Sequence, residues 1–201
     1  MKLINNSSED EMILEFLKGE YNSARFNKKL VDVLNKLKLN SKIIEEGNLS
    51  YDENNARKEI MKMFRGYPDS ELFNKFPKNI DWKFVEFEEG DINNIYYIDY
   101  DYWNLLSNNT SKAEEAARTI REGIEIYEVS NQPFLDGLEY IKSGKFPPVI
   151  LLSCNDEKFL IIEGHSRMTV YGMDPEKFIG TYGFVGYCSK EEMEIYDSRM
   201  I

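Results

Sequence analysis

Two apolar runs joined by a tight turn constrain the fold of this chain most strongly. Pro147-Pro148 forces an extended entry into the first run, Val-Ile-Leu-Leu-Ser at 149–153, because proline fixes its own backbone and disfavours a helical residue before it. Asn155-Asp156 supplies turn chemistry before the second run, Lys-Phe-Leu-Ile-Ile at 158–162. Short apolar runs separated by such a turn predict a β-hairpin.

The first part of the chain has the spacing of helices. Apolar residues recur on one face in 9–17 and again in 26–37, which is the pattern of amphipathic helices. A third helix is expected to begin at a cap, Asp52, and to end at Gly66. The sequence therefore predicts an N-terminal helical extension over residues 1–78.

Strands are expected after this extension. Trp82–Phe87 and Ile95–Ile98 are rich in aromatic and β-branched residues, which favour strands. Turn residues lie between them, so the two segments are expected to pair as a hairpin. A last strand is expected around 178–187. Residues 79–201 are accordingly predicted to form the core of a mixed α/β (α+β) protein.

Three further helices are predicted within this core, besides a short helix that follows residues 163–167. Ser111-Lys-Ala-Glu114 has the form of a capping box, and Gly123 stands where a helix would end. Residues 133–141 carry apolar side chains at helical spacing, and Ser189 caps a helix near the end of the sequence. No internal repeat or linker marks a domain boundary. The division near residue 78 therefore rests only on the change from helix-like to strand-like residue patterns.

Composition excludes several functions. The net charge of -11 argues against an extensive DNA-binding surface, because duplex binding depends on Lys and Arg that neutralise phosphates. No apolar run approaches the roughly 18 residues that span a bilayer, and the N-terminus lacks the apolar region of a signal peptide. We therefore expect a cytoplasmic protein without a membrane partner. Cys154 and Cys188 lack metal-site spacing and are expected to be buried thiols.

The strongest candidate for a functional site is the segment Glu163-Gly-His-Ser-Arg167, which lies between a predicted buried strand and a predicted helix. The first turn of a helix offers unpaired N–H groups and the positive end of its dipole, so it favours an anion. Gly164 lets the backbone approach closely, and Ser166 and Arg167 can donate to phosphate oxygens. His165, the single histidine, can donate to the anion or act as a base.

A purely structural interpretation stands beside this one. Ser166 can be a plain helix cap, His165 a core residue with its hydrogen bonds satisfied, and Arg167 half of an ion pair with Glu163. The short motif alone does not decide between the two interpretations.

A longer stretch resembles the core signature of the bacterial ParB/sulfiredoxin-like superfamily. The stretch from Phe134 to Tyr171 has the order helix, proline, strand, turn, strand, acidic-Gly-His-x-Arg, helix, and a strand is expected to follow at 178–185. The resemblance implies a small mixed sheet with flanking helices. It also implies that Gly164, His165, Ser166 and Arg167 bind the phosphates of a nucleotide.

The superfamily includes nucleotide-hydrolysing partition proteins, sulfinic acid reductases and free-serine kinases. Gly164 stands where the reductases carry their catalytic cysteine, which argues against reductase chemistry. Partition proteins follow the loop with a DNA-binding domain, whereas only a short segment follows Arg167 here. The kinases need an acidic base, and Glu163 is the acid that the resemblance carries over.

Other side chains are weaker candidates. Arg57, Arg65 and Arg118 are positioned in predicted helices from which a phosphate could be reached. The aromatic series Tyr96–Trp103 can stack a base, although core packing and hairpin pairing explain it better. A basic helix can contact nucleic acid, although a solvated face is the commoner outcome; its cations are Arg25, Lys28, Lys29, Lys36, Lys38 and Lys42.

The sequence thus predicts a protein that binds a nucleotide, with Mg²⁺, or a phosphorylated small molecule through Gly164, His165, Ser166 and Arg167. If it is an enzyme, the expected class is phosphoryl transfer or nucleotide hydrolysis, with Glu163 and His165 as catalytic residues. No metal site made by the protein alone is predicted. The alternative is a non-enzymatic module whose N-terminal helices bind a protein or nucleic-acid partner.

Overall fold

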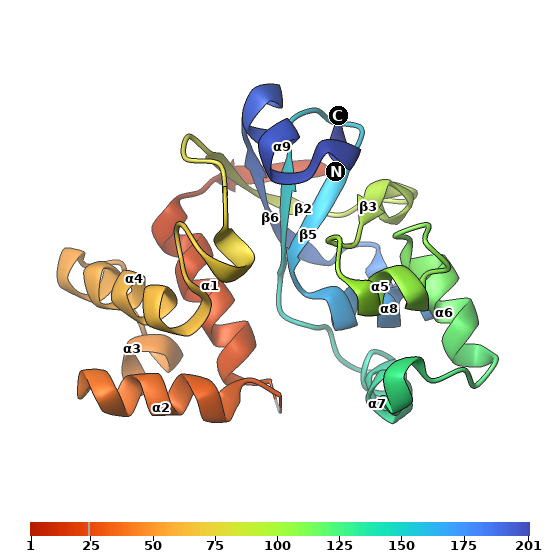
Figure 1. The fold of residues 1–201 in the computed structure, drawn as a ribbon, viewed down its shortest axis with the longest axis horizontal. Coiled ribbons are helices and arrows are strands. Elements are labelled where there is room, and N and C mark those ends of the chain that lie inside the picture. Colours follow the sequence, from red (N-terminus) through yellow and green to blue (C-terminus); the bar gives the residue numbers. More distant parts are fainter. Residues whose placement is uncertain (24) are drawn as a thin grey trace.

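A six-stranded sheet runs through the middle of the chain in the computed structural model, which describes residues 1–23 and 25–201 (Figure 1). The strand order is β1-β2-β6-β4-β5-β3. The bounds are Lys2–Asn6 for β1, Asp81–Glu86 for β2, Ile95–Tyr96 for β3, Val149–Ser153 for β4, Phe159–Glu163 for β5 and Tyr182–Tyr187 for β6. With helices on both sides of these strands, the predicted α+β class is confirmed.

The predicted hairpin of β4 and β5 is confirmed, because the two strands pair antiparallel. β6 pairs parallel with β4 and antiparallel with β2. The predicted pairing of 82–87 with 95–98 is wrong: β2 lies between β1 and β6, and β3 pairs parallel with β5. Strand propensity located both segments, but it carries no information on the partner that each strand finds at long range.

Strand β1 was not predicted. It pairs antiparallel with β2 at the edge of the sheet, with an irregularity between Leu3 and Asn5, and all five of its residues are exposed. Such a strand shows no alternation of buried and exposed residues, which explains why no strand pattern marks it. Part of the predicted N-terminal extension therefore lies in the sheet, while the division near residue 78 stays a prediction.

The four N-terminal helices gather to the left of the strands in Figure 1. Their bounds are Glu9–Tyr21 for α1, Asn27–Leu37 for α2, Lys42–Glu45 for α3 and Tyr51–Arg65 for α4. A capping box of Ser8 and Glu11 begins α1. Helix α4 begins after Ser50 rather than at the predicted cap Asp52, and it ends at Gly66, whose φ of 74° suits glycine.

The remaining helices lie mainly to the right of the strands in Figure 1. Their bounds are Asp101–Leu106 for α5, Ala113–Arg121 for α6, Gln132–Tyr140 for α7, His165–Met173 for α8 and Lys190–Asp197 for α9. Helix α5 was not predicted. The predicted capping box of Ser111 is wrong, because Lys112 is the N-cap residue of α6 and no side chain caps it. Ser111 instead has a φ of 57°.

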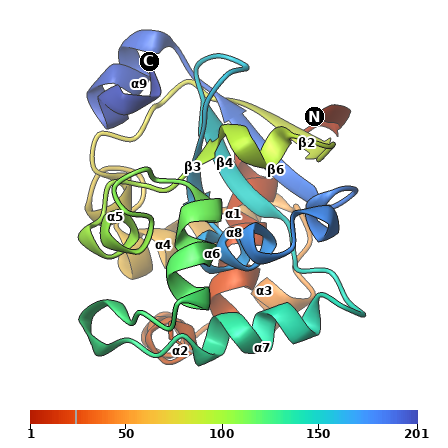
Figure 2. The ribbon, with the colours of Figure 1, turned by 90° about the vertical axis from the view of Figure 1, so that its right-hand side faces the viewer.

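Helix α8 packs closely against α6, as Figure 2 shows. A Cβ on Gly172 of α8 would lie only 2.4 Å from the carbonyl oxygen of Ala113. Glycine is thus needed at this contact, because any larger residue would push the two helices apart. Since α8 begins at His165, this packing fixes the position of the predicted anion loop.

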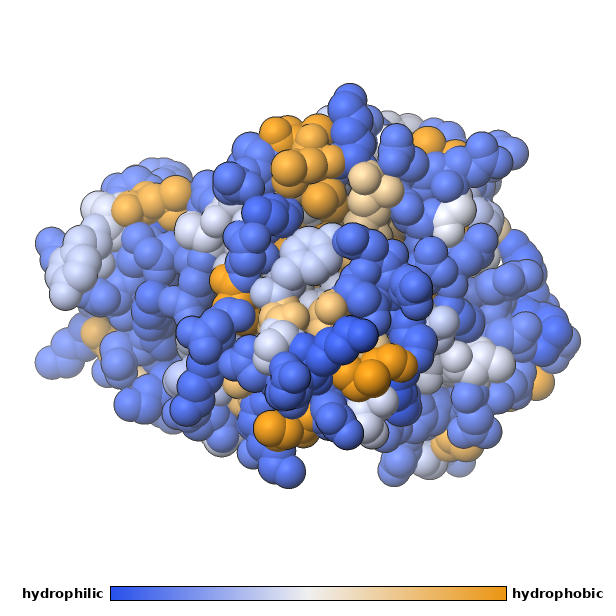
Figure 3. Space-filling view, turned by 90° about the horizontal axis from the view of Figure 1, so that it is seen from above, coloured by the Kyte–Doolittle hydropathy of each residue, from blue (hydrophilic) through white to orange (hydrophobic). Residues whose placement is uncertain are grey.

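The surface seen in Figure 3 is mainly hydrophilic, with separate hydrophobic patches. None of the helices in residues 1–23 and 25–201 has both the length and the apolar character needed to span a bilayer. Cys154 and Cys188 are half-buried rather than fully buried, because both follow the last residues of their strands. Both are free thiols.

Candidate functional site

The predicted anion loop lies where β5 ends and α8 begins. Gly164 is the N-cap residue of α8 and has a φ of 103°, and a Cβ there would lie 2.7 Å from Cγ1 of Val149. No side chain caps this helix start, and Ser166 in its first turn is exposed. The backbone N–H groups of the turn are therefore not used by a side-chain cap, and they have the geometry that favours an anion.

Arg167 is held by partners within the chain. Its guanidinium forms an ion pair with Glu163, and its Nη1 donates to the carbonyl oxygens of Pro147 at 2.8 Å and Pro148 at 2.6 Å. Burial lowers the pKa of Arg167 to about 10, so the side chain stays charged at neutral pH. The ion pair with Glu163 that the structural interpretation expected is present. The two hydrogen bonds to the proline carbonyls tie the loop to the entry of β4.

His165 lies in an aromatic stack. Its ring stacks on Trp103, with centroids 5.2 Å apart, and on Tyr97 at 6.1 Å. Burial, with the charge of Arg65 adding to it, lowers the pKa of His165 to about 3. The imidazole is therefore neutral near pH 7. Its Nε2 is buried without a hydrogen-bond partner, so the predicted core histidine with satisfied hydrogen bonds is not what the structure contains.

A buried hydrogen bond joins this stack to α8. The hydroxyl of Tyr97 and Oγ1 of Thr169 lie 2.7 Å apart, and both residues are fully buried. Oγ1 of Thr169 donates to the backbone oxygen of His165 at 2.9 Å, which leaves Tyr97 as the donor in the first bond. The aromatic residues 97 and 103 thus position the histidine of the loop.

Helix α1 covers the other side of the loop. Gly19 lies so close to Glu163 that a Cβ at position 19 would be 3.2 Å from Oε1. Burial raises the pKa of Glu15, and the charge of Arg167 opposes that rise. The position of α1 at the loop was not predicted from the sequence. The available signal was Gly19 itself, since glycine inside a helix lowers its stability and is favoured there only where packing leaves no room for a side chain.

The end of α4 brings Arg65 to the same site. Glu20 of α1 is only 4% exposed and forms an ion pair with Nε of Arg65 at 3.6 Å. Burial raises the pKa of Glu20, and the charges of Arg65 and Arg167 oppose the rise. The guanidinium of Arg65 lies over the ring of Phe26, 4.8 Å from its centroid. We call Glu20, Arg65, His165, Ser166 and Arg167 the loop site.

The structure separates the three candidate arginines. Arg57 is fully buried and donates to the backbone oxygens of Ile43 and Asn48. Arg118 pairs with Glu115 on the surface of α6. Of the three, Arg65 is the one whose charge contributes to the lowered pKa of His165. The five lysines of the predicted basic helix are exposed: Lys28, Lys29, Lys36, Lys38 and Lys42.

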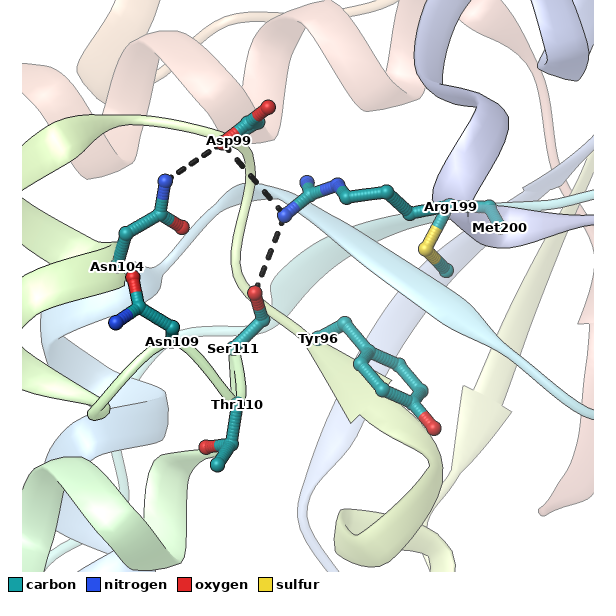
Figure 4. Close-up of a pocket in the computed structure, with 8 residues that line it drawn as sticks. All are labelled: Tyr96, Asp99, Asn104, Asn109, Thr110, Ser111, Arg199 and Met200. Carbon is teal, nitrogen blue, oxygen red and sulfur yellow. Dashed lines mark hydrogen bonds and ion pairs between the residues drawn. The ribbon is translucent and has the colours of Figure 1, made fainter.

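A separate cavity of about 300 Å³ lies beside Tyr96 and Arg199 (Figure 4). Arg199 points toward Asp99 and Ser111 there, and its Nη1 donates to Oγ of Ser111 at 3.1 Å. Asp197 also pairs with this arginine. Its donors are therefore occupied. The cavity is lined by Tyr96, Asp99, Asn104, Asn109, Thr110, Ser111, Arg199 and Met200. None of the residues of the predicted anion loop is among them, whereas Tyr96 belongs to the aromatic series that was a weaker candidate.

No group of three or more His, Cys, Asp or Glu side chains suited to a metal ion occurs in the described part of the chain. Comparison of the sequence with models of protein families, and of the chain with curated proteins and with solved structures, gives no significant match.

Proposed function

We propose that the loop site binds the phosphate of a nucleotide or of a phosphorylated small molecule. The observation that carries the proposal is the start of α8, where Gly164 opens the turn, no side chain caps the helix and Ser166 is exposed. The positive charges of Arg65 and Arg167 act on the same region. Free N–H groups, a helix dipole and cations together favour a multiply charged oxyanion.

The order of strand, loop and helix also supports the proposed resemblance to the ParB/sulfiredoxin-like superfamily. If the site is catalytic, phosphoryl transfer or nucleotide hydrolysis fits it best, because such reactions depend on positioning and charge neutralisation. A divalent ion such as Mg²⁺ would arrive with the nucleotide. Glu163 would have to leave Arg167 before it could act as a base, and neutral His165 would serve as a hydrogen-bonding group.

The sharpest test replaces Ser166 with aspartate. Ser166→Asp puts a carboxylate where the phosphate is proposed to bind, and an exposed acid in a first helical turn stabilises the helix by about 0.3–1 kcal/mol. Loss of binding would therefore not result from unfolding. Ser166→Asn is the matched control, since it has nearly the same size and no charge.

Binding is measured by thermal shift against ATP, CTP, GTP and inorganic phosphate, each with and without Mg²⁺. A ligand at 100 times its Kd stabilises the fold by about 2.7 kcal/mol. We expect a shift for the wild type and Ser166→Asn, and none for Ser166→Asp. Equal shifts for both variants would remove the start of α8 from the site, and the absence of any shift in the wild type at millimolar ligand would contradict the proposal.

The exposure of the α2 lysines favours one second candidate, a module that binds nucleic acid or another protein through the N-terminal helices. Charge reversal at Lys28, Lys29 and Lys36 tests it. Labelled duplex DNA and single-stranded RNA are titrated at low and high salt, since binding through lysines weakens steeply with salt. Binding that is lost on reversal would support the module, and the absence of binding to either would exclude its nucleic-acid form.

A further inference from the structure

Arg65, which is half-buried, differs from Arg57 and Arg167 in how its donors are used. Arg167 has Glu163 and two carbonyl oxygens as partners, and Arg57 has backbone oxygens and side chains around it. Nε of Arg65 is buried and makes no hydrogen bond within the described residues, and its ion pair with Glu20 is 3.6 Å long. A guanidinium with donors left over is suited to a ligand.

Two aromatic rings hold Arg65 in place. Its guanidinium lies 4.8 Å from the ring centroid of Phe26 and 5.9 Å from that of Phe64. Stacking on aromatic faces fixes the plane of the group and contributes cation–π attraction, while the donors at its edge stay available. Because the guanidinium is already fixed, the side chain loses little conformational entropy when an oxyanion binds to its edge in a bidentate manner.

Arg65 also faces the start of α8. It pairs with Glu20 of α1, and Gly19, the neighbour of Glu20, packs against Glu163 at the end of β5, so α4 and α1 bring Arg65 to the region where α8 begins. Nε of Arg65 and Nε2 of His165 are both buried and make no hydrogen bond among the described residues. Buried polar atoms without a hydrogen bond are uncommon in a native interior, and one explanation for them is a bound ligand.

Glu20 restricts the kind of ligand. Its carboxylate is almost fully buried beside Arg65, and no other ion pair of Glu20 is found in the described chain. A bare anion bound to Arg65 would lie close to this negative charge and be repelled. A ligand with a hydroxyl or amino group next to its phosphate would instead donate to the carboxylate.

We propose that Arg65 is the side chain that binds the ligand's phosphate, and that Glu20 accepts a hydrogen bond from a hydroxyl or amino group of the same ligand. This inference rests on the function proposed above. It gives the N-terminal helices a direct part in the site. The ligand is accordingly a phosphorylated compound with an adjacent donor, such as a nucleotide with its ribose hydroxyls, rather than inorganic phosphate.

The first experiment measures the Kd of the tightest nucleotide of the panel, by calorimetry, for Arg65→Gln and for Lys62→Gln. Lys62 is exposed on the same helix and provides the matched loss of one positive charge. We expect Arg65→Gln to weaken binding about ten- to a hundredfold, the equivalent of one charge-assisted contact, and Lys62→Gln to change it little. Arg65→Lys should retain part of the affinity.

Two further variants keep the test decisive. Arg65→Gln leaves Glu20 without its partner, so the double variant Arg65→Gln/Glu20→Gln, which has no unpaired charge, is measured if the single one unfolds. Glu20→Gln alone should weaken nucleotide binding and strengthen the binding of inorganic phosphate, because the repulsion is gone. If Glu20 only repelled anions and accepted no hydrogen bond from the ligand, Glu20→Gln would strengthen the binding of the nucleotide as well as that of inorganic phosphate.

The outcomes separate the two proposals. Nucleotide binding that Ser166→Asp abolishes and that neither Arg65→Gln nor the double variant weakens would overturn the role of Arg65 and leave the loop proposal standing. Absence of binding to the wild type would overturn both proposals. Equal effects of Arg65→Gln and Lys62→Gln would show that only net charge matters and would also overturn the inference.

Discussion

Gly19 of α1 lies against the carboxylate of Glu163, at a distance that leaves no free space for a side chain: a Cβ would be 3.2 Å from Oε1. This contact joins the N-terminal helices to the loop site. It also keeps Glu163 facing Arg167, its ion-pair partner. The position of the loop therefore depends on a helix that the sequence places far from it.

A larger residue at position 19 should disturb the loop. Gly19→Val is expected to destabilise the protein by about 1–3 kcal/mol, since the new methyl groups must displace Glu163. Lys18→Val is the control, because it introduces the same β-branched residue one position away at a partly exposed site. Urea denaturation measures both. Helix propensity alone would make Gly19→Val slightly stabilising and Lys18→Val slightly destabilising, because Val is a better helix former than Gly and a worse one than Lys. A free energy of unfolding that Gly19→Val leaves unchanged or raises would contradict the contact.

Arg167→Ala should lower stability strongly. The substitution leaves the half-buried carboxylate of Glu163 and two carbonyl oxygens without their donor. Breaking a buried pair in this way costs about 3–5 kcal/mol. Arg167→Ala/Glu163→Ala, which removes both charges, should recover part of this loss. Denaturation midpoints that do not differ between the single and double variants would contradict the importance of the pair.

Stability should depend on pH through His165. Its pKa of about 3 in the fold lies below the ordinary 6.5, so the unfolded chain takes up a proton that the folded chain does not. The stabilisation is complete above pH 6.5 and decreases as the pH falls toward 3. Between pH 6.5 and 5 the loss amounts to about 2 kcal/mol.

His165→Phe is the control for that prediction, because phenylalanine keeps the stack on Trp103 and does not titrate. Its free energy of unfolding should be flatter between pH 5 and 6.5 than that of the wild type. Glu15 and Glu20 act in the opposite direction, since burial raises their pKa values and their stabilisation is lost as the pH rises through them. Parallel curves for the two proteins would show that His165 titrates normally.

The buried bond between Tyr97 and Thr169 should show energetic coupling. Thr169→Val leaves the hydroxyl of Tyr97 without a partner, which costs about 1–3 kcal/mol. Tyr97→Phe costs less, because the threonine hydroxyl still donates to His165. In the double variant the penalty of the orphaned hydroxyl disappears. The unfolding free energies of all four proteins form the cycle, and strict additivity would contradict the bond.

Local signals in the sequence were sufficient for much of the secondary structure. The hairpin of β4 and β5 is visible because two apolar runs flank a turn of Asn155-Asp156, and the end of α4 is visible because Gly66 has a left-handed conformation. The capping box at Ser111 failed because the pattern of residue types matches a cap while the backbone there does not adopt one. A cap depends on backbone conformation, which neighbouring elements impose.

The loop itself was also visible in the sequence, since strand, glycine and helix follow each other without interruption. What could not be predicted is which side chains surround it. Gly19, Glu20 and Arg65 reach the site only through the packing of α1 and α4 against the core, and no local pattern encodes that distance. The partner of β2 was missed for the same reason.

The order of strands in the sheet has a consequence for how quickly the protein folds. The inner neighbour of β2 is β6, and their pairing brings Asp81 opposite Tyr187, although a long stretch of the chain separates these residues. Contacts between distant segments form slowly, because a long loop must close before any pairing is gained. The β4–β5 hairpin needs only a short loop to close. We therefore expect it to form early in folding, before β6 pairs with β4 and completes the centre of the sheet.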